Sequence, residues 1–272
     1  MSSLPECSTL LTELDAKTGV LSLTLNRPEK RNAMNEVMVA EIIEVFSAIS
    51  DRSEVRAVIL RGSDGHFCAG GDISTMHNAT DSEGNKLPAD QAAWVFNRNF
   101  GRMISQVQQA PQTVIAVLEG ASMGGGFGLA CVSDVAIAHA EASFSMPETG
   151  LGIIPAQIAP FVVKRIGLTQ ARCLALLGEQ VNGNQALTLG LVHYVAEDAE
   201  SLELKLQEVV KKVARRGPVA NARTKELMLM VGTMPEDELL DSAADMFATA
   251  INSEEGKEGT RAFLEKRKPS WA

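Results

Sequence analysis

The chain has 272 residues, 45% of them hydrophobic, which is enough for one large domain or two modest ones around a buried core. Its formal net charge of −9 argues against sequence-independent binding to nucleic acid or anionic lipid, because both need a basic surface. The four cysteines stand far apart with no CxxC pair, so the sequence indicates neither a disulfide framework nor a zinc site: Cys7, Cys68, Cys131 and Cys173.

The first ten residues lack the basic and apolar regions of a signal peptide and the Arg-rich pattern of a transit peptide. We therefore expect a protein of the reducing cytoplasm. The most apolar stretch, residues 113–132, contains Glu119 and several glycines, so it does not predict a membrane span.

The first half of the chain alternates between strand and helix patterns. Apolar and polar residues alternate over 21–25, which predicts a strand, and apolar residues at helical spacing over 38–49 predict a helix. The apolar run 57–60 predicts a second strand. The polar stretch 78–90 is typical of an exposed loop, and a helix is expected from there to about residue 109.

The second half changes character. Apolar runs at 114–118 and 135–138 predict strands on either side of a glycine cluster and a helix. Beyond about residue 168 the patterns are mostly helical, in particular over 202–215, 220–231, 236–251 and 254–268. We predict an α/β core over 1–200 and a helical region over 201–272. Periodicity alone does not decide between an open sheet and a solenoid-like spiral.

Two glycine-rich turns each follow a predicted buried strand and precede a helix. The first spans residues 66–72 and the second residues 120–126. Glycine permits close backbone approach, and free N–H groups at the start of a helix attract negative charge. Two such turns that face each other could form an oxyanion hole, whereas each turn taken separately is equally consistent with a tight structural turn.

Glu148 is the ionisable candidate, because it follows a proline in an apolar, glycine-rich neighbourhood. Partial burial there would raise its pKa, as a proton shuttle requires, although a capping or surface role is also consistent with the pattern. Asp72 and Asp134 are expected to cap or anchor turns. The sequence has no GxGxxG or Walker pattern, and its histidines have no ligand-like spacing, so it predicts no metal site.

Taken together, these stretches resemble the crotonase (enoyl-CoA hydratase/isomerase) superfamily from about residue 21 to 271. The ordered set of matches is specific: residues 25–28 with 32–34, the 67–72 turn, Gly120 with 124–126, Phe144 with 147–148, Gly152 with Pro155, 190–192, and the ending at 255–256 and 262–269. The resemblance implies an α/β spiral of ββα units, a helical C-terminal trimerisation region, and a homotrimer or a dimer of trimers.

The resemblance also implies site residues. The backbone N–H groups of Gly71 and Gly125 match the family's oxyanion hole, and Glu148 matches the carboxylate that exchanges a proton with the substrate α-carbon. Coenzyme A would enter as part of the acyl thioester substrate, with no permanently bound cofactor. Its expected contacts are Lys30 or Arg31, the backbone at Ala69 and Gly70, and Phe263 and Lys266 on a C-terminal helix that closes the site, sometimes on a neighbouring subunit.

The chain departs from the family pattern at position 128, where hydratases usually carry a second glutamate and this sequence has Gly128. An isomerase that moves a double bond from the 3 to the 2 position manages with one carboxylate. The segment 152–163, however, resembles bacterial hydratases of 3-methylglutaconyl-CoA and isohexenylglutaconyl-CoA, from leucine or acyclic terpene catabolism, which also tend to have Gly there. We favour the hydratase.

In that hydratase the distal carboxylate of a glutaconyl substrate would help to orient the attacking water. Its expected partners are Arg98, Arg102 or His77, although both arginines are equally consistent with a solvated helix face. A catalytically silent scaffold or RNA-binding relative is the alternative from another class. The acidic charge balance and the retention of both glycines with Glu148 argue against it.

Overall fold

The computed structural model describes residues 4–75 and 85–272. Six strands in these residues form one sheet in the order β1-β2-β3-β4-β6-β9. Only β1 and β2 are antiparallel neighbours, and the others pair in parallel. Their bounds are β1 Leu10–Asp15, β2 Val20–Leu25, β3 Ala57–Gly62, β4 Thr113–Leu118, β6 Val135–His139 and β9 Tyr194–Ala196. The carboxyl ends of the parallel strands therefore lie at one edge.

A second, smaller sheet begins beyond that edge. It has the order β5-β7-β8, with bounds β5 Ala121–Met123, β7 Ser143–Ser145 and β8 Gln180–Asn182. Isolated parallel bridges join Cys68 to Ser122 and Met34 to Gly71, so the turns after β2 and β3 continue the same layer. Each passage through the two layers is followed by a helix, which gives the repeated ββα spiral that the sequence resemblance implied.

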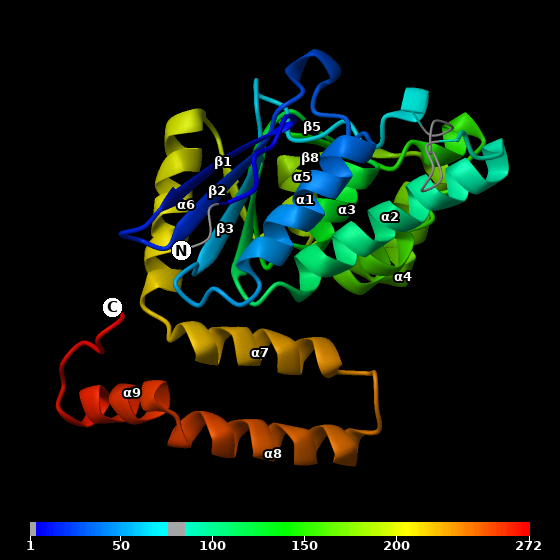
Figure 1. Ribbon diagram of the computed structural model, residues 1–272. Helices are drawn as coiled ribbons and strands as arrows, with labels where there is room; N and C mark the ends of the chain where they lie inside the picture. Colours follow the sequence, from blue (N-terminus) through cyan, green and yellow to red (C-terminus); the bar gives the residue numbers. More distant parts are fainter. Residues whose placement is uncertain (1–3, 76–84) are drawn as a thin grey trace.

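Helices cover both faces of the main sheet (Figure 1). One face of the sheet packs against α1 (Glu36–Ile49), α2 (Ala89–Gln109) and α3 (Gly125–Val132), and the other packs against α6 (Ala199–Ala214). On β3, for example, Val58 and Leu60 enter the first core while Ala57 and Ile59 enter the second. This double burial explains why the parallel strands read as apolar runs rather than as alternations.

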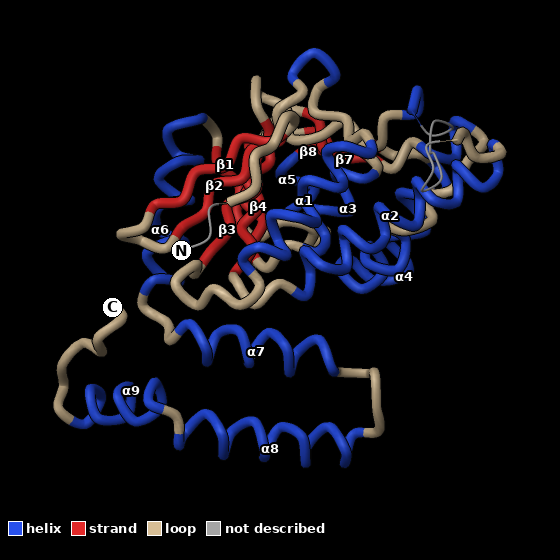
Figure 2. Tube along the Cα trace, in the orientation of Figure 1, coloured by secondary structure: helices blue, strands red, loops and turns tan. Residues whose placement is uncertain are grey.

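The C-terminal helices α7 (Pro218–Met230), α8 (Glu236–Asn252) and α9 (Glu254–Leu264) stand below the core, with α8 alongside α7 on the side away from the sheet (Figure 2). Within the described part of the chain, neither α7 nor α8 contains a fully buried residue. Large apolar side chains stay exposed there, among them Phe247 at 68% and Phe263 at 82%.

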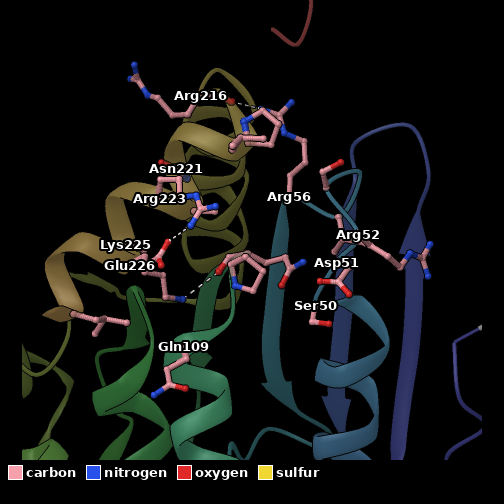
Figure 3. Close-up of a pocket in the computed structure, with 18 of the residues that line it drawn as sticks. Ser50, Asp51, Arg52, Arg56, Gln109, Arg216, Asn221, Arg223, Lys225 and Glu226 are labelled. Atoms are coloured by element: carbon pink, nitrogen blue, oxygen red, sulfur yellow. Dashed lines mark hydrogen bonds and ion pairs between the residues drawn. The ribbon is translucent and has the colours of Figure 1, made fainter. Parts of the chain in front are cut away.

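Polar contacts attach α7 to the core. Lys225 Nζ donates to Asp134 over 2.7 Å, and Asn221 Nδ2 donates to Thr113 Oγ1 over 2.9 Å. Burial lowers the pKa of Lys225, although Asp134 opposes that shift. A cavity of about 600 Å³ remains in this joint (Figure 3), between the end of α1, the start of β3 and α7. Asp134 therefore anchors the chain as expected: its carboxylate accepts hydrogen bonds from Val114 N of β4 and from Lys225 of α7.

The predicted strands and long helices are confirmed, but several short strands were missed. They are β1, the three strands of the small sheet, and β9, which pairs with the predicted strand β6. The remaining helices are α4 (Ala159–Leu177) and α5 (Gly183–Thr188), with 3₁₀ turns η1 Pro28–Lys30, η2 Ile73–Thr75 and η3 Glu148–Leu151. The domain boundary that the sequence predicts near residue 200 falls at the start of α6. This helix packs on the sheet and belongs to the core. No described helix has the length and hydrophobicity needed to cross a bilayer.

Candidate functional site

The first glycine turn is held rigidly at the carboxyl end of β3. Met34 N donates to Gly70 O and Asp72 N donates to Met34 O, each over 2.8 Å, so Gly71 is clamped from both sides. Arg27 extends the clamp, because its guanidinium donates to Ala33 O and, over 3.0 Å, to Asp72 Oδ2. Hydrogen bonds, from Ser74 first and then from Arg27, hold the pKa of Asp72 below its usual range. Asp72 directly precedes η2, and its Oδ1 accepts a hydrogen bond from Ser74 N over 3.2 Å, as expected of a capping residue.

Asn32 fixes the segment before Met34 to the same turn. It is completely buried, and its amide accepts from Arg27 N and donates to Ser63 O and His66 O over 2.7–2.9 Å. Its φ of 57° is one that asparagine tolerates better than most residues. The amide therefore joins the chain after β2 to the chain after β3.

The second glycine turn follows β4 and leads into α3. Gly124 adopts φ +47° and ψ −113°, a conformation that favours glycine, and its N–H donates to Ser145 O over 2.9 Å. Helix α3 begins at Gly125. A Cβ on Gly125 would lie 2.7 Å from Met34 Cε and 3.0 Å from the Phe100 ring, so a side chain there would displace the Met34 methyl group and crowd the ring.

The two turns touch. A Cβ on Gly70 would lie 3.2 Å from Met123 O and 3.7 Å from Gly125 N. Backbone hydrogen bonds from Cys68 N to Ala121 O and from Met123 N to Cys68 O hold this approach. Neither Gly71 N–H nor Gly125 N–H donates to an acceptor in the described residues. Two unused donors in adjoining turns can bind one developing oxyanion, and the α3 dipole favours negative charge at Gly125.

Glu148 lies beside the second turn. It starts η3 after Pro147, and its Oε1 would be 2.7 Å from a Cβ on Gly124. Its Oε2 is buried and has no hydrogen-bond partner among the described residues. Burial raises the pKa of the Glu148 carboxyl. A carboxyl group that holds its proton more tightly than usual, next to an oxyanion site, is suited to move a proton to and from carbon.

Position 128 is closed by packing. A Cβ on Gly128 would lie 2.4 Å from Ile158 Cγ2, 3.0 Å from Ile158 Cβ and 3.0 Å from Ile104 Cδ1. Ile158 is only 3% exposed and stands at the start of α4. A side chain at position 128 therefore requires Ile158, at the start of α4, to shift.

The expected coenzyme A residues fall into two groups. Ala69 N donates to Arg31 O over 2.9 Å, so Lys30 and Arg31, both exposed, border the turn that contains Ala69 and Gly70. Phe263 and Lys266 lie instead at the opposite end of the molecule, on and just after α9 (Figure 1). Within one chain the structure does not bring them to Glu148.

The arginines expected to bind a substrate carboxylate, Arg98 and Arg102, lie on α2 and border a surface groove with Phe46 and Gln109. Arg98 also reaches toward Gln157, since Arg98 Nη1 and Gln157 Oε1 both lie within 3 Å of the position of a Cβ on Gly101. Arg102 also donates to Asn99 Oδ1 over 2.8 Å. The alternative interpretation, that the arginines belong to a solvated helix face, fits the exposed Arg102. His77 lies outside the described residues, 4–75 and 85–272.

No role could be assigned from the sequence to the residues that support the site, although Arg27, Asn32 and Met34 belong to the stretches that match the family. The Arg27 and Asn32 contacts and the packing of Met34 and Phe100 on Gly125 are long-range, so spacing could not show them. Ile158 carries no signal of its own within the apolar segment 152–163. The one available signal for its role was Gly128 itself, since glycine inside a helix often marks a close contact.

Comparison with known proteins supports the same interpretation. The family described as "Enoyl-CoA hydratase/isomerase" matches residues 15–272. The short-chain-enoyl-CoA hydratase of Clostridium acetobutylicum is 32% identical, with 97% of each chain covered. The structure of Pseudomonas aeruginosa AtuE is 52% identical with a TM-score of 0.91, covering 97% of this chain and 100% of that one. An enoyl-CoA hydratase/isomerase structure from Marinobacter aquaeolei is 50% identical, also with a TM-score of 0.91, covering 97% and 99%.

Proposed function

This chain belongs to the enoyl-CoA hydratase/isomerase family and acts on enoyl-CoA thioesters, and from that premise we propose that it is a hydratase with a single carboxylate. The observation that carries the proposal is the placement of the Glu148 carboxylate beside two adjoining glycine turns with unused N–H donors. We further propose a branched glutaconyl ester, such as 3-methylglutaconyl-CoA or isohexenylglutaconyl-CoA, as the substrate.

The thioester carbonyl oxygen binds between Gly71 N–H and Gly125 N–H. As water attacks C3, the C2=C3 π electrons move toward this oxygen and an enolate forms, so the two donors are used most strongly in the transition state. Removal of one such donor typically costs about 3 kcal/mol of transition-state stabilisation. Met34 and Phe100 pack on Gly125 and keep the donor in place.

Glu148 carries the proton from water to carbon. Its carboxylate takes one proton from the attacking water while the C3–O bond forms, and the neutral carboxyl then gives that proton to C2 as the enolate collapses. The net change is the addition of one water, with the carboxylate restored. Burial favours this cycle, because a raised pKa keeps the neutral form of Glu148 accessible.

A single carboxylate leaves one task open, which is to orient the attacking water. We propose that the distal carboxylate of a glutaconyl substrate performs it and so replaces the side chain that position 128 lacks. The resemblance of segment 152–163 to glutaconyl-CoA hydratases supports this substrate class. Of the proposed partners of that carboxylate, Arg98 lies beside Gln157 and is better placed than Arg102, which borders a surface groove.

The coenzyme A moiety is proposed to lie along Ala69 and Gly70, with its phosphates near Lys30 or Arg31. Phe263 is 82% exposed and α9 is remote from the site of its own chain, which supports closure of the coenzyme A site by α9 of a neighbouring subunit. We propose a homotrimer or a dimer of trimers on the same grounds, because the exposed apolar side chains of α7–α9 need a partner surface.

A 3,2-enoyl-CoA isomerase is the second candidate. The packing of Ile158 on Gly128 favours it, since an isomerase activates no water and needs only Glu148 to move a proton between C2 and C4.

One panel of thioesters separates the two functions. The purified protein is incubated with 3-methylglutaconyl-CoA, isohexenylglutaconyl-CoA, crotonyl-CoA and a 3-enoyl-CoA, with 2-enoyl absorbance and product mass followed in each. Gain of one water by a glutaconyl ester, lost in Glu148→Gln, supports the hydratase. Rising 2-enoyl absorbance from the 3-enoyl ester at constant mass, with no hydration of any ester, would contradict it.

A further inference from the structure

Position 128 lies one helical turn beyond the glycine that borders the catalytic carboxylate. Gly128 N donates to Gly124 O over 3.0 Å, so the two residues stand one helical turn apart. Gly124 itself precedes the helix, and a Cβ on it would lie 2.7 Å from Glu148 Oε1. A carboxylate at position 128, where the hydratases that this chain resembles carry one, would therefore start one helical turn from the residue that borders Glu148.

Ile158 occupies that space. Two of its atoms lie within 3.0 Å of the position of a Cβ on Gly128, and one of them is its own Cβ, which cannot move without the backbone. That backbone is fixed, because Ile158 O accepts hydrogen bonds from Phe161 N and Val162 N at the start of α4. Ile104, the other neighbour, approaches only with Cδ1, the far end of its side chain, which can move without the backbone.

We propose that Ile158 is the specificity-determining residue of this site: it excludes a second carboxylate and so restricts hydration to esters that carry their own polar group to orient water. The proposal rests on the hydratase function proposed above. Gly128 alone does not determine the one-carboxylate site, since any side chain placed there meets Ile158 first.

The packing half of the proposal is tested without any substrate. Gly128→Ala lowers Tm by about 2–10 °C in the wild-type background, because the added methyl group overpacks the contact with Ile158. In an Ile158→Ala background the same change has little or no effect on Tm. Ile104→Ala is the matched control and leaves most of the Gly128→Ala loss in place. Equal losses in all three backgrounds would overturn the assignment to Ile158.

The catalytic half is tested with crotonyl-CoA, which has no distal carboxylate. Gly128→Glu combined with Ile158→Ala raises kcat/KM for crotonyl-CoA hydration by about tenfold or more over both wild type and Ile158→Ala, since a second general base contributes at least that much. The control is Gly128→Gln combined with Ile158→Ala. The glutamine side chain has the size of glutamate but no carboxylate, so this variant shows no such gain. A Gly128→Glu single variant as active as the double variant would overturn the proposal.

The outcomes distinguish this proposal from the proposed function. If wild type hydrates no glutaconyl ester, the proposed function fails, whereas the Tm comparison still decides whether Ile158 closes position 128. If the double variant does not fold, the Tm comparison with the smaller Gly128→Ala change decides it. A folded double variant with no gain on crotonyl-CoA, from a wild type that does hydrate a glutaconyl ester, refutes the specificity role.

Discussion

Gly124→Ala tests whether the glycine turn positions the Glu148 carboxylate. The new Cβ would lie 2.7 Å from Glu148 Oε1, whereas ordinary contacts begin at 3.4 Å, so the oxygen must move by the difference of 0.7 Å. A displacement of about 1 Å in a catalytic group can reduce the rate about 100-fold. We therefore expect kcat to fall about 30- to 100-fold. The φ of +47° adds backbone strain of about 1–3 kcal/mol and lowers Tm.

The assay is steady-state turnover of the thioester that the panel identifies as substrate, with circular dichroism to confirm folding. Gly150→Ala is the matched control, because it lies two residues from Glu148 and a Cβ there meets no atom within 4 Å. Its kcat should stay within about twofold of wild type, as is usual for a substitution that touches nothing. If folded Gly124→Ala has the same kcat as Gly150→Ala, the reasoning is refuted.

Three further predictions concern buried polar groups. Because burial raises the pKa of Glu148 in the folded state, stability falls as pH rises from the unfolded pKa, about 4.3, through the folded one. Glu148→Gln should thus have a higher Tm than wild type at pH 7, with the difference shrinking toward pH 5; a lower Tm at pH 7 would contradict this. For the same reason the acidic limb of kcat/KM in wild type should lie above the pH expected of an ordinary glutamate, and a limb near 4.3 would count against it. Asn32→Ala leaves the Ser63 and His66 carbonyls unpaired and should cost about 3 kcal/mol of unfolding free energy, measured by urea titration, whereas a loss under about 0.5 kcal/mol would show that the amide is dispensable.

The main sheet and its helices could be predicted because each buried element has a local signature. The apolar runs of β3 and β4 are buried on both faces, and the apolar stripe of α1 matches a 3.6-residue period. The small sheet could not be predicted, since its three-residue strands are shorter than any pattern that periodicity can resolve.

The site was predictable only in part. The glycine turns and Glu148 carry local signals, namely glycine clusters after strands and a carboxylate in an apolar segment. The side of a helix that faces the site is set by packing instead. The sequence therefore could not show that Arg98 and Arg102 border a surface groove. The contact between Ile158 and Gly128 joins residues 30 positions apart, so spacing gives no indication of it.

The central claim is that Glu148 exchanges a proton with the α-carbon of a thioester whose enolate is held by Gly71 and Gly125. The most direct measurement is deuterium incorporation at C2 when the thioester that the panel identifies as substrate is turned over in heavy water, followed by mass spectrometry. Glu148 transfers solvent-derived deuterium to C2 either when water adds or when α-deprotonation reverses. The account predicts enzyme-dependent deuteration at C2 that disappears in Glu148→Gln. Exchange at an undiminished rate in folded Glu148→Gln would contradict it.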